Sequence, residues 1–274
     1  MTEKPQNIDE YKVWASTNHG HEFDKRCAMW YKVATQNIFQ TLEDSLLPAI
    51  QREIESADTA YRLAVGADLF VTPEVPVLRW SIKTFESAID KLYRTNVVWN
   101  HRWPNPPASA AWTTNPGAKA WVGPYDCLQR LDDVIRTRVV CKYLDGPTFL
   151  SARIRDLVES MGIGCEVGSR ELDAGYYSHH MYFDINVENI GPGLETTETR
   201  NRIELQITTQ LQDVLMNLTH RFYEKDRLKL SRAERPWRWD YGTPQFKSAY
   251  LGHTLHLLEA LVIEVRDEIG ETDE

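Results

Sequence analysis

The chain has 274 residues, 42% of them hydrophobic, and its 40 acidic residues against 31 Lys and Arg give a formal net charge of −9. Such an acidic chain is not expected to coat nucleic acid non-specifically, although a local basic patch could still hold phosphates. No apolar run approaches the roughly 20 residues of a membrane span, and the first residues lack a signal-peptide pattern, so we expect one large domain in the cytoplasm. The four cysteines are far apart and form no zinc spacing, so we expect them to be reduced and mostly buried.

The first half of the chain is predicted to be mainly helical. Apolar residues at helical spacing from about Glu22 to Leu63 predict one or two amphipathic helices. Prolines in Val71–Pro76 end that pattern, and another helix is predicted near Trp80–Tyr93, with Lys83, Ser87 and Lys91 at every fourth residue of one face. Taken alone, that charged face fits a solvated surface. The stretch Asn100–Gly123 is rich in proline and tryptophan, which predicts an ordered but irregular segment.

The centre of the chain has the patterns of a β-sheet. Val134–Cys141 is rich in β-branched residues, and Ile163–Val167 is a second predicted strand after a helix over Thr148–Met161. His179–Val187 and Arg202–Thr208 alternate between apolar and polar residues. Strands mixed with helices in this way predict an α+β fold.

Two further helices are predicted near the end, at 211–222 and 249–269. His253 and His256 lie one turn apart on the second of them, a spacing that could hold a metal, but the surrounding leucines favour partly buried helix residues. The spacing predicts that one set of apolar side chains faces inward: Leu251, Leu255, Leu258, Leu261, Val262 and Val265.

Two carboxylates are placed where a metal could bind. Asp133 lies where a loop enters a predicted strand, and Glu204 projects from the polar face of another. If those strands are neighbours, the two acids meet at one cleft, and Mg²⁺ prefers such oxygen ligands together with substrate phosphates. Taken alone, each carboxylate is better explained without a metal, Asp133 as a turn residue and Glu204 as a solvated strand residue.

The order of several short motifs resembles the synthetase domain of the RelA/SpoT family, the alarmone synthetases with a nucleotidyltransferase-like fold. The family pattern is Arg-x-Lys-x-x-x-Ser-x-x-x-Lys, Asp-x-x-Gly-x-Arg, Gly-Tyr-x-Ser-x-His, Glu-x-Gln-x-Arg-Thr and a closing His with a nearby Tyr or Lys. Several motifs in fixed order are far more specific than any one of them. The matching segments are Ser81–Lys91, Asp132–Val139, Gly175–His180, Glu204–Thr209, His220 and Lys225.

The resemblance covers roughly residues 75–228. It implies a nucleotidyltransferase-like fold with a mixed β-sheet flanked by helices. It also implies that the protein is an ATP-dependent pyrophosphokinase that makes (p)ppGpp. It implies an N-terminal helical segment over 1–70, the synthetase domain over 71–230, and a basic, aromatic loop and helix over 231–274 packed on that domain. The resemblance further implies that Asp133 and Glu204 are catalytic and hold Mg²⁺, and that Glu204 is the base for the acceptor hydroxyl. The implied ATP-binding residues are Arg79, Lys83, Lys91 and Arg138, and the implied acceptor-binding residues are Tyr176, Ser178, His180, Gln206, Arg170, His220 and Lys225.

The departures from the family pattern lie mainly on the acceptor side. Ser81 replaces the first arginine of the helix motif, with Arg79 nearby to compensate, and Arg136 and Thr208 replace a glycine and an arginine. Before Gly175, where relatives carry lysines for the acceptor phosphates, only Arg170 remains. An acceptor other than GDP or GTP is therefore an alternative.

Toxic members of the family supply that alternative, because they act on the 3′ end of tRNA or on adenosine nucleotides. A tRNA backbone would then lie along Arg232, Arg235 and Arg238. The implied partners are ATP and a nucleotide acceptor; an antitoxin protein and a homo-oligomer stay open, and no membrane is implied. A module that binds nucleotide without turnover is the remaining alternative, suggested by the substitutions.

Overall fold

A computed structural model describes residues 3–272, except 112, 114–115, 173–174, 192, 194 and 228–239. The side chains of 170–172, 220–227 and 271–272 also lie outside the description. The elements, in chain order, are α1 Ile8–His19, α2 Lys25–Glu43, α3 Leu46–Val65, β1 Ser81–Ile82, α4 Phe85–Tyr93, the π-helical η1 Arg94–Val98, α5 Cys127–Arg130, β2 Ile135–Cys141, α6 Gly146–Ser160, β3 Gly164–Leu172, β4 Tyr176–Ile190, β5 Thr196–Thr209, α7 Gln210–Arg227 and α8 Pro244–Thr272.

The five strands form one sheet in the order β1-β2-β5-β4-β3. Strand β1 runs antiparallel to β2, with Ser81 opposite Arg136 and Ile82 opposite Ile135. The predicted α+β class and a mixed sheet flanked by helices are therefore confirmed. Each strand predicted from alternation is present, and each extends beyond its predicted limits.

The apolar face that alternation predicted for each of the two long strands is buried, and residues of the opposite face such as His180 and Glu204 are buried as well. Met181 and Phe183 of β4 and Leu205 and Ile207 of β5 are fully buried. Because successive strand residues point to opposite faces, the polar residues between them share the other face of the sheet. That face carries the candidate residues Tyr176, Ser178 and His180 of β4 and Glu204 and Gln206 of β5.

Contacts group the chain into two compact units. Unit 1 consists of Met1–Leu46, Trp80–Arg136 and Tyr182–Glu204. Unit 2 consists of Leu47–Arg79, Thr137–Met181 and Leu205–Glu274. Strands β2, β4 and β5 each contribute residues to both units.

In unit 1, helix α4 starts later than its apolar spacing predicted. The predicted helix over Trp80–Tyr93 is wrong in its first turn, because Ser81–Ile82 pairs with β2 as a strand. Thr84 is the N-cap residue, and its hydroxyl accepts a hydrogen bond from the amide of Ser87 at 3.2 Å. A threonine cap satisfies a backbone donor that the helix itself leaves unpaired, and thereby fixes where the helix begins.

The tryptophan-rich segment of unit 1 is ordered and irregular, as predicted. Its described residues form turns and one bridge, between Ala108 and Lys119. The Trp103 and Trp121 rings lie 5.4 Å apart, and each also contacts Trp14 of α1. The segment is therefore held by aromatic packing within its own unit.

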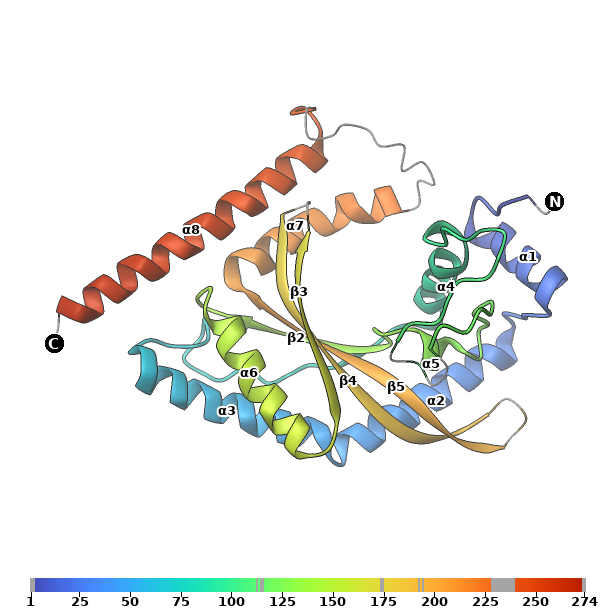
Figure 1. The fold of residues 1–274 in the computed structure, drawn as a ribbon, viewed down its shortest axis with the longest axis horizontal. Coiled ribbons are helices and arrows are strands. Elements are labelled where there is room, and N and C mark those ends of the chain that lie inside the picture. The colour runs from blue at the N-terminus through green and yellow to red at the C-terminus, as the bar shows by residue number, and fades with distance from the viewer. Residues whose placement is uncertain are drawn as a thin grey trace. The chain divides into compact units, whose positions relative to one another are not determined.

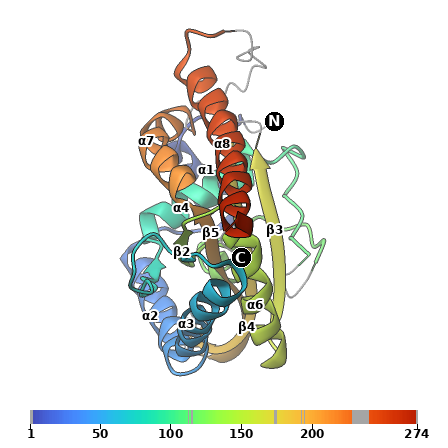
Figure 2. The same ribbon diagram turned by 90° about the vertical axis from the view of Figure 1, so that its left-hand side faces the viewer.

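In unit 2, α6 packs against β3, and α7 packs against α8 (Figure 1, Figure 2). The face of α8 predicted to point inward is wrong. Five of the six predicted residues are between 45% and 55% exposed: Leu251, Leu258, Leu261, Val262 and Val265. The buried side of this helix instead carries Ala249, Gly252 and Glu259.

The cysteines are free, as predicted, and three of the four are buried. Among the described residues, no helix is both long and apolar enough to cross a bilayer.

Candidate active site

The junction between β1 and α4 fixes the backbone of Lys83 in unit 1. The amide of Lys83 donates to the carbonyl oxygen of Val134 at 2.7 Å, and its own carbonyl accepts from the Tyr31 hydroxyl at 2.8 Å. Lys91 lies two turns further along, on α4. Both ammonium groups are thus carried by a segment that is hydrogen-bonded to the start of β2.

The two lysines converge on the carboxylate of Asp133. Lys83 Nζ lies 3.1 Å from Asp133 Oδ2, and Lys91 Nζ lies 2.7 Å from Asp133 Oδ1. Lys91 also contacts Asp132 Oδ1 at 2.5 Å. The side chains of Lys83, Lys91 and Asp133 are at least four-fifths buried, so these ion pairs are screened less than surface pairs. Two cations and two acids therefore form one largely desolvated cluster.

Burial and ion pairing act against each other on the charges of this cluster. Burial raises the pKa of Asp133, but Lys91 and Lys83 outweigh that effect and bring the pKa to about 2. Burial lowers the pKa of Lys83, although Asp133 opposes the shift. Burial also acts to lower the pKa of Lys91, yet Asp133 and Asp132 raise it overall. Asp133 is thus held as a carboxylate at neutral pH.

Glu204 lies on β5, in the same unit as Asp133. The sheet order makes β5 the neighbour of β2, whose first residue follows Asp133 by two positions. Only 3% of Glu204 is exposed, which contradicts the alternative of a solvated strand residue. A buried glutamate on the polar face of a central strand is seldom neutral to function or stability.

The carboxylates suit a magnesium ion by chemistry. Among the described residues, no group of three His, Cys, Asp or Glu side chains could hold a metal. Mg²⁺ does not need such a group, since it is commonly bound by one or two carboxylates, waters and substrate phosphates. Asp133 and Glu204 provide oxygen ligands of that kind, and Asp133 is kept charged. By ligand type, each of the two carboxylates could contribute to a magnesium site that substrate phosphates and water complete.

Unit 2 carries the other predicted residues, and one cluster joins β2, β5 and α7. The Arg138 guanidinium donates to Gln206 Oε1 at 3.2 and 3.3 Å and to Asp213 Oδ1 at 2.8 Å. Arg138 and Gln206, which come from two different motifs, are thereby in contact. Asp213 was not identified from the sequence; its position one turn into α7, after the Glu-x-Gln motif, is the signal that could have found it.

The Gly-Tyr-x-Ser-x-His motif forms the start of β4. The Tyr176 hydroxyl lies 3.0 Å from Nε2 of His180, and the two rings meet edge to face at 6.0 Å. Tyr176 is half-buried, whereas His180 is buried. The buried Ser178 donates its hydroxyl to the carbonyl of Ile207 at 3.0 Å, so in this structure it ties β4 to β5.

Other predicted residues are placed apart from these clusters or cannot be placed. Arg79 is exposed, and its carbonyl accepts from Thr137 at 2.9 Å. Thr208, which replaces the motif arginine, is buried and donates to the carbonyl of Tyr177 at 3.2 Å. The side chains of Arg170, His220 and Lys225 lie outside the described residues, as do Arg232, Arg235 and Arg238 entirely.

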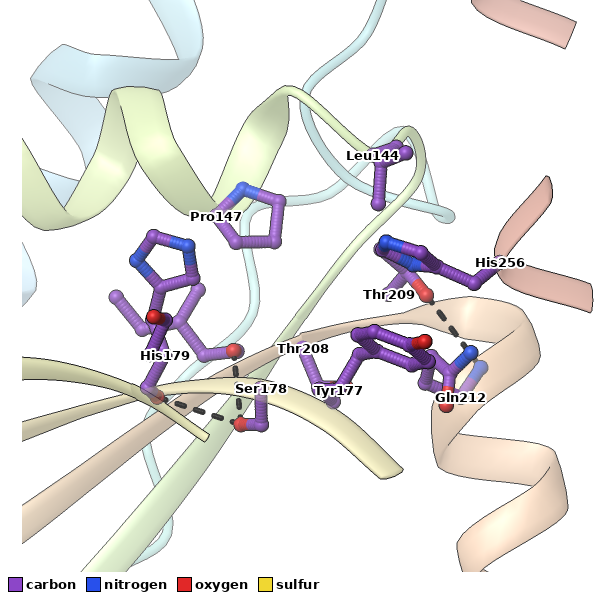
Figure 3. A pocket seen from close by; sticks show the side chains of 11 residues that line it. Leu144, Pro147, Tyr177, Ser178, His179, Thr208, Thr209, Gln212 and His256 are labelled. Atoms are coloured by element: carbon purple, nitrogen blue, oxygen red, sulfur yellow. Dashed lines mark hydrogen bonds between the residues drawn. The ribbon is translucent and has the colours of Figure 1, made fainter. Parts of the chain in front are cut away.

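A small cavity of about 80 Å³ in unit 2 was not expected from the sequence. It is lined by Tyr177 and His179 of β4, by Gln212 of α7 and by His256 of α8 (Figure 3). His179 Nδ1 lies 3.3 Å from the Ser151 hydroxyl of α6.

The comparisons with known proteins return structures only. No protein-family model matches the chain. No curated protein sequence matches it either. Similarity is found to the structure of a GTP pyrophosphokinase family protein from Streptococcus pneumoniae, at 14% identity and a TM-score of 0.47, over 85% of this chain and 94% of that chain.

Small alarmone synthetase 1 from Bacillus subtilis is similar at 13% identity and a TM-score of 0.47, over 83% of this chain and 97% of that chain. The structure of the same synthetase bound to its product pppGpp is similar at 13% identity and a TM-score of 0.45, over 84% of this chain and 99% of that chain. At such low identities and TM-scores, these similarities assign no role to individual residues. The roles are therefore argued from the contacts within this chain.

Proposed function

We propose that the protein is an ATP-dependent pyrophosphokinase, and in particular one that transfers pyrophosphate from ATP to the 3′-hydroxyl of a guanosine nucleotide, as alarmone synthetases do. The observation that carries the proposal is the convergence of Lys83 and Lys91 on Asp133. These residues come from two motifs that are distant in the chain, and a buried group of cations around a carboxylate is suited to binding a polyphosphate. The contact between Arg138 and Gln206 joins two further motifs.

The residues have complementary tasks in this reaction. The acceptor 3′-oxygen attacks the β-phosphorus of ATP, the bond from that phosphorus to the α-phosphate oxygen breaks, and AMP leaves. Lys83 and Lys91 would bind the ATP phosphates and balance charge that develops in transfer. Glu204 would accept the proton from the attacking hydroxyl. No covalent intermediate with the protein is required.

Asp133 and Glu204 would hold Mg²⁺, which when bound would neutralise phosphate charge. Until nucleotide arrives, the lysines balance the charge of Asp133. Exchange of lysine contacts from carboxylate to phosphate would keep every charge in the cluster paired, which avoids leaving a buried ion without a partner.

For the acceptor, Tyr176 supplies a half-buried aromatic ring. Stacking of a base on such a ring contributes about 1–3 kcal/mol in single-strand binding proteins. The ring is hydrogen-bonded to His180 through its hydroxyl, which leaves the stacking contribution to the ring faces.

A second acceptor class is favoured by one specific feature, the sequence before Gly175. Between Cys165 and Ala174 the only basic residue is Arg170, so few cations are available for acceptor phosphates. The 3′ end of tRNA or an adenosine nucleotide is therefore the second candidate acceptor.

The deciding experiment is acceptor labelling. The full chain is incubated with ATP labelled in its β- or γ-phosphate, Mg²⁺ and one of GDP, GTP, an adenosine nucleotide or deacylated tRNA. Label in a guanosine nucleotide, with AMP formed in equal amount, supports the proposal, and label in tRNA or an adenosine nucleotide instead supports the second candidate. Absence of AMP with every acceptor, while ATP still raises the melting temperature, would identify a binding module without turnover.

A further inference from the structure

Both neighbours of Tyr176 in the sequence are in contact with helix α8. Gly175 has a φ of +74°, and a Cβ atom placed there would lie 2.2 Å from the carbonyl oxygen of Ala249. A Cβ atom on Gly252 would lie 2.0 Å from the carbonyl oxygen of Gly175. Only glycine allows backbones to approach this closely, so the start of β4 rests directly on α8.

Tyr177 is held by the two histidines that lie one turn apart on α8. Its ring stacks on the His256 ring, with centroids 3.7 Å apart and planes at 3°. Its hydroxyl lies 2.7 Å from Nδ1 of His253. Figure 3 shows the His256 ring lying over the Tyr177 ring at the cavity. One histidine therefore fixes the plane of the ring and the other fixes its outer end.

Helix α8 is itself anchored elsewhere in unit 2. Near its C-terminal end, the Arg266 guanidinium donates to both carboxylate oxygens of Asp145, at 3.3 and 3.1 Å, and to the Tyr61 hydroxyl at 2.9 Å. The Tyr61 hydroxyl donates in turn to Asp145 at 2.7 Å. Paired, bidentate contacts of this kind fix orientation as well as position. The helix is a rigid support rather than a free end.

The alternation of a strand places Tyr176 on the face opposite Tyr177. The contacts of α8 therefore fix the backbone on both sides of Tyr176 while leaving its ring on the face that carries His180, Gln206 and Arg138. We infer that His253 and His256 are positioning residues for the acceptor: they hold the Gly175–Tyr177 segment so that the Tyr176 ring is in place for a base. This inference rests on the proposed function and assigns a role that the motif itself does not contain.

The test compares His256→Ala, which removes the stacked ring, with His256→Phe, which keeps a flat ring. Tyr177→Phe, which removes only the contact with His253, is the second variant, and Leu258→Ala is the control, because Leu258 lies on the same helix and is 47% exposed. We expect His256→Ala to raise the KM for GTP about tenfold, the size of one weakened base stack, with little change in the KM for ATP or in kcat. His256→Phe should restore most of the loss, Tyr177→Phe should show a smaller rise, and the control should show none.

Amide hydrogen exchange of residues 175–180, measured without nucleotide, separates this inference from the proposed function. We expect faster exchange there in His256→Ala and wild-type rates in His256→Phe. Wild-type protein that transfers no label to any acceptor overturns the proposed function, whatever the exchange result. The positioning role alone is overturned if the wild type is active but His256→Ala has unchanged exchange. It is also overturned if His256→Ala raises the KM values for ATP and GTP equally. If His256→Ala fails to fold, the Tyr177→Phe result decides in the same way.

Discussion

Lys91 of helix α4 and Asp133 of the loop before β2 form an ion pair of 2.7 Å between Nζ and Oδ1. The pair joins two segments that only the tertiary structure brings together. Because Lys83 contacts the other oxygen of the same carboxylate, neither lysine can be removed without changing the charge balance of the cluster.

Replacing Lys91 with Met should lower the rate of pyrophosphate transfer by about 10²-fold, the usual cost of removing one charge-stabilising group from a phosphoryl-transfer site. Methionine keeps most of the side-chain volume, so the loss reports on charge. The rate is measured as AMP formed per minute at saturating ATP. Lys12→Met is the matched control, because Lys12 is 40% exposed and its nearest acid is 3.9 Å away. A Lys91→Met enzyme with wild-type activity would remove Lys91 from the donor site.

Replacing Glu204 with Gln should reduce transfer by at least about 10²-fold, because the amide cannot accept the proton of the acceptor hydroxyl. The change is nearly isosteric, so the melting temperature should stay close to that of the wild type. Glu198→Gln, an exposed position on the same strand, should leave both values unchanged. Full activity in Glu204→Gln would show that another group takes the proton.

Replacing Gly252 with Ala should lower the free energy of unfolding by roughly 1–3 kcal/mol, the usual cost of overpacking, because the new methyl group would meet the Gly175 backbone. Gly270→Ala, on the same helix, is the control, since a Cβ atom there has nothing within 4 Å. It should be neutral or slightly stabilising, as alanine favours helix. Denaturant unfolding measures both. Equal stability of the two variants would contradict the close contact between α8 and Gly175.

Glu259 predicts a dependence of stability on pH. Burial raises its pKa above the ordinary value, although the neighbouring polar side chains of Thr209 and Gln212 oppose the shift. A carboxyl group with a raised folded-state pKa binds its proton more tightly when folded, so its contribution to stability is complete below about pH 4.5 and is lost as pH rises through the folded-state pKa. Glu259→Gln should therefore flatten the fall in stability between pH 4.5 and 8 and should be more stable at pH 8. Exposed Glu264→Gln, on the same helix, should keep the wild-type profile; a profile in Glu259→Gln that also matches wild type would contradict the shift.

The sequence by itself determined four of the five strands of the sheet, the class of fold and the identity of the motif residues. Alternation identified the buried faces of β4 and β5 because a strand has only two faces and Met181, Phe183, Leu205 and Ile207 all fall on one. The resemblance to the family motifs likewise predicted Lys83, Lys91 and Asp133 as site residues, and the structure shows that they are in contact.

Only the tertiary structure decided which partners these residues find. Helical spacing predicted that the leucines of α8 point inward, yet the contact with Gly175 selects the small residues Ala249 and Gly252 for the buried side. Periodicity defines stripes on a helix, but the distance to the neighbouring backbone determines which stripe packs. Asp132 and Asp213 were missed because their contacts are made with residues far away in the sequence, and those contacts appear only when Lys91 or Arg138 is seen beside them.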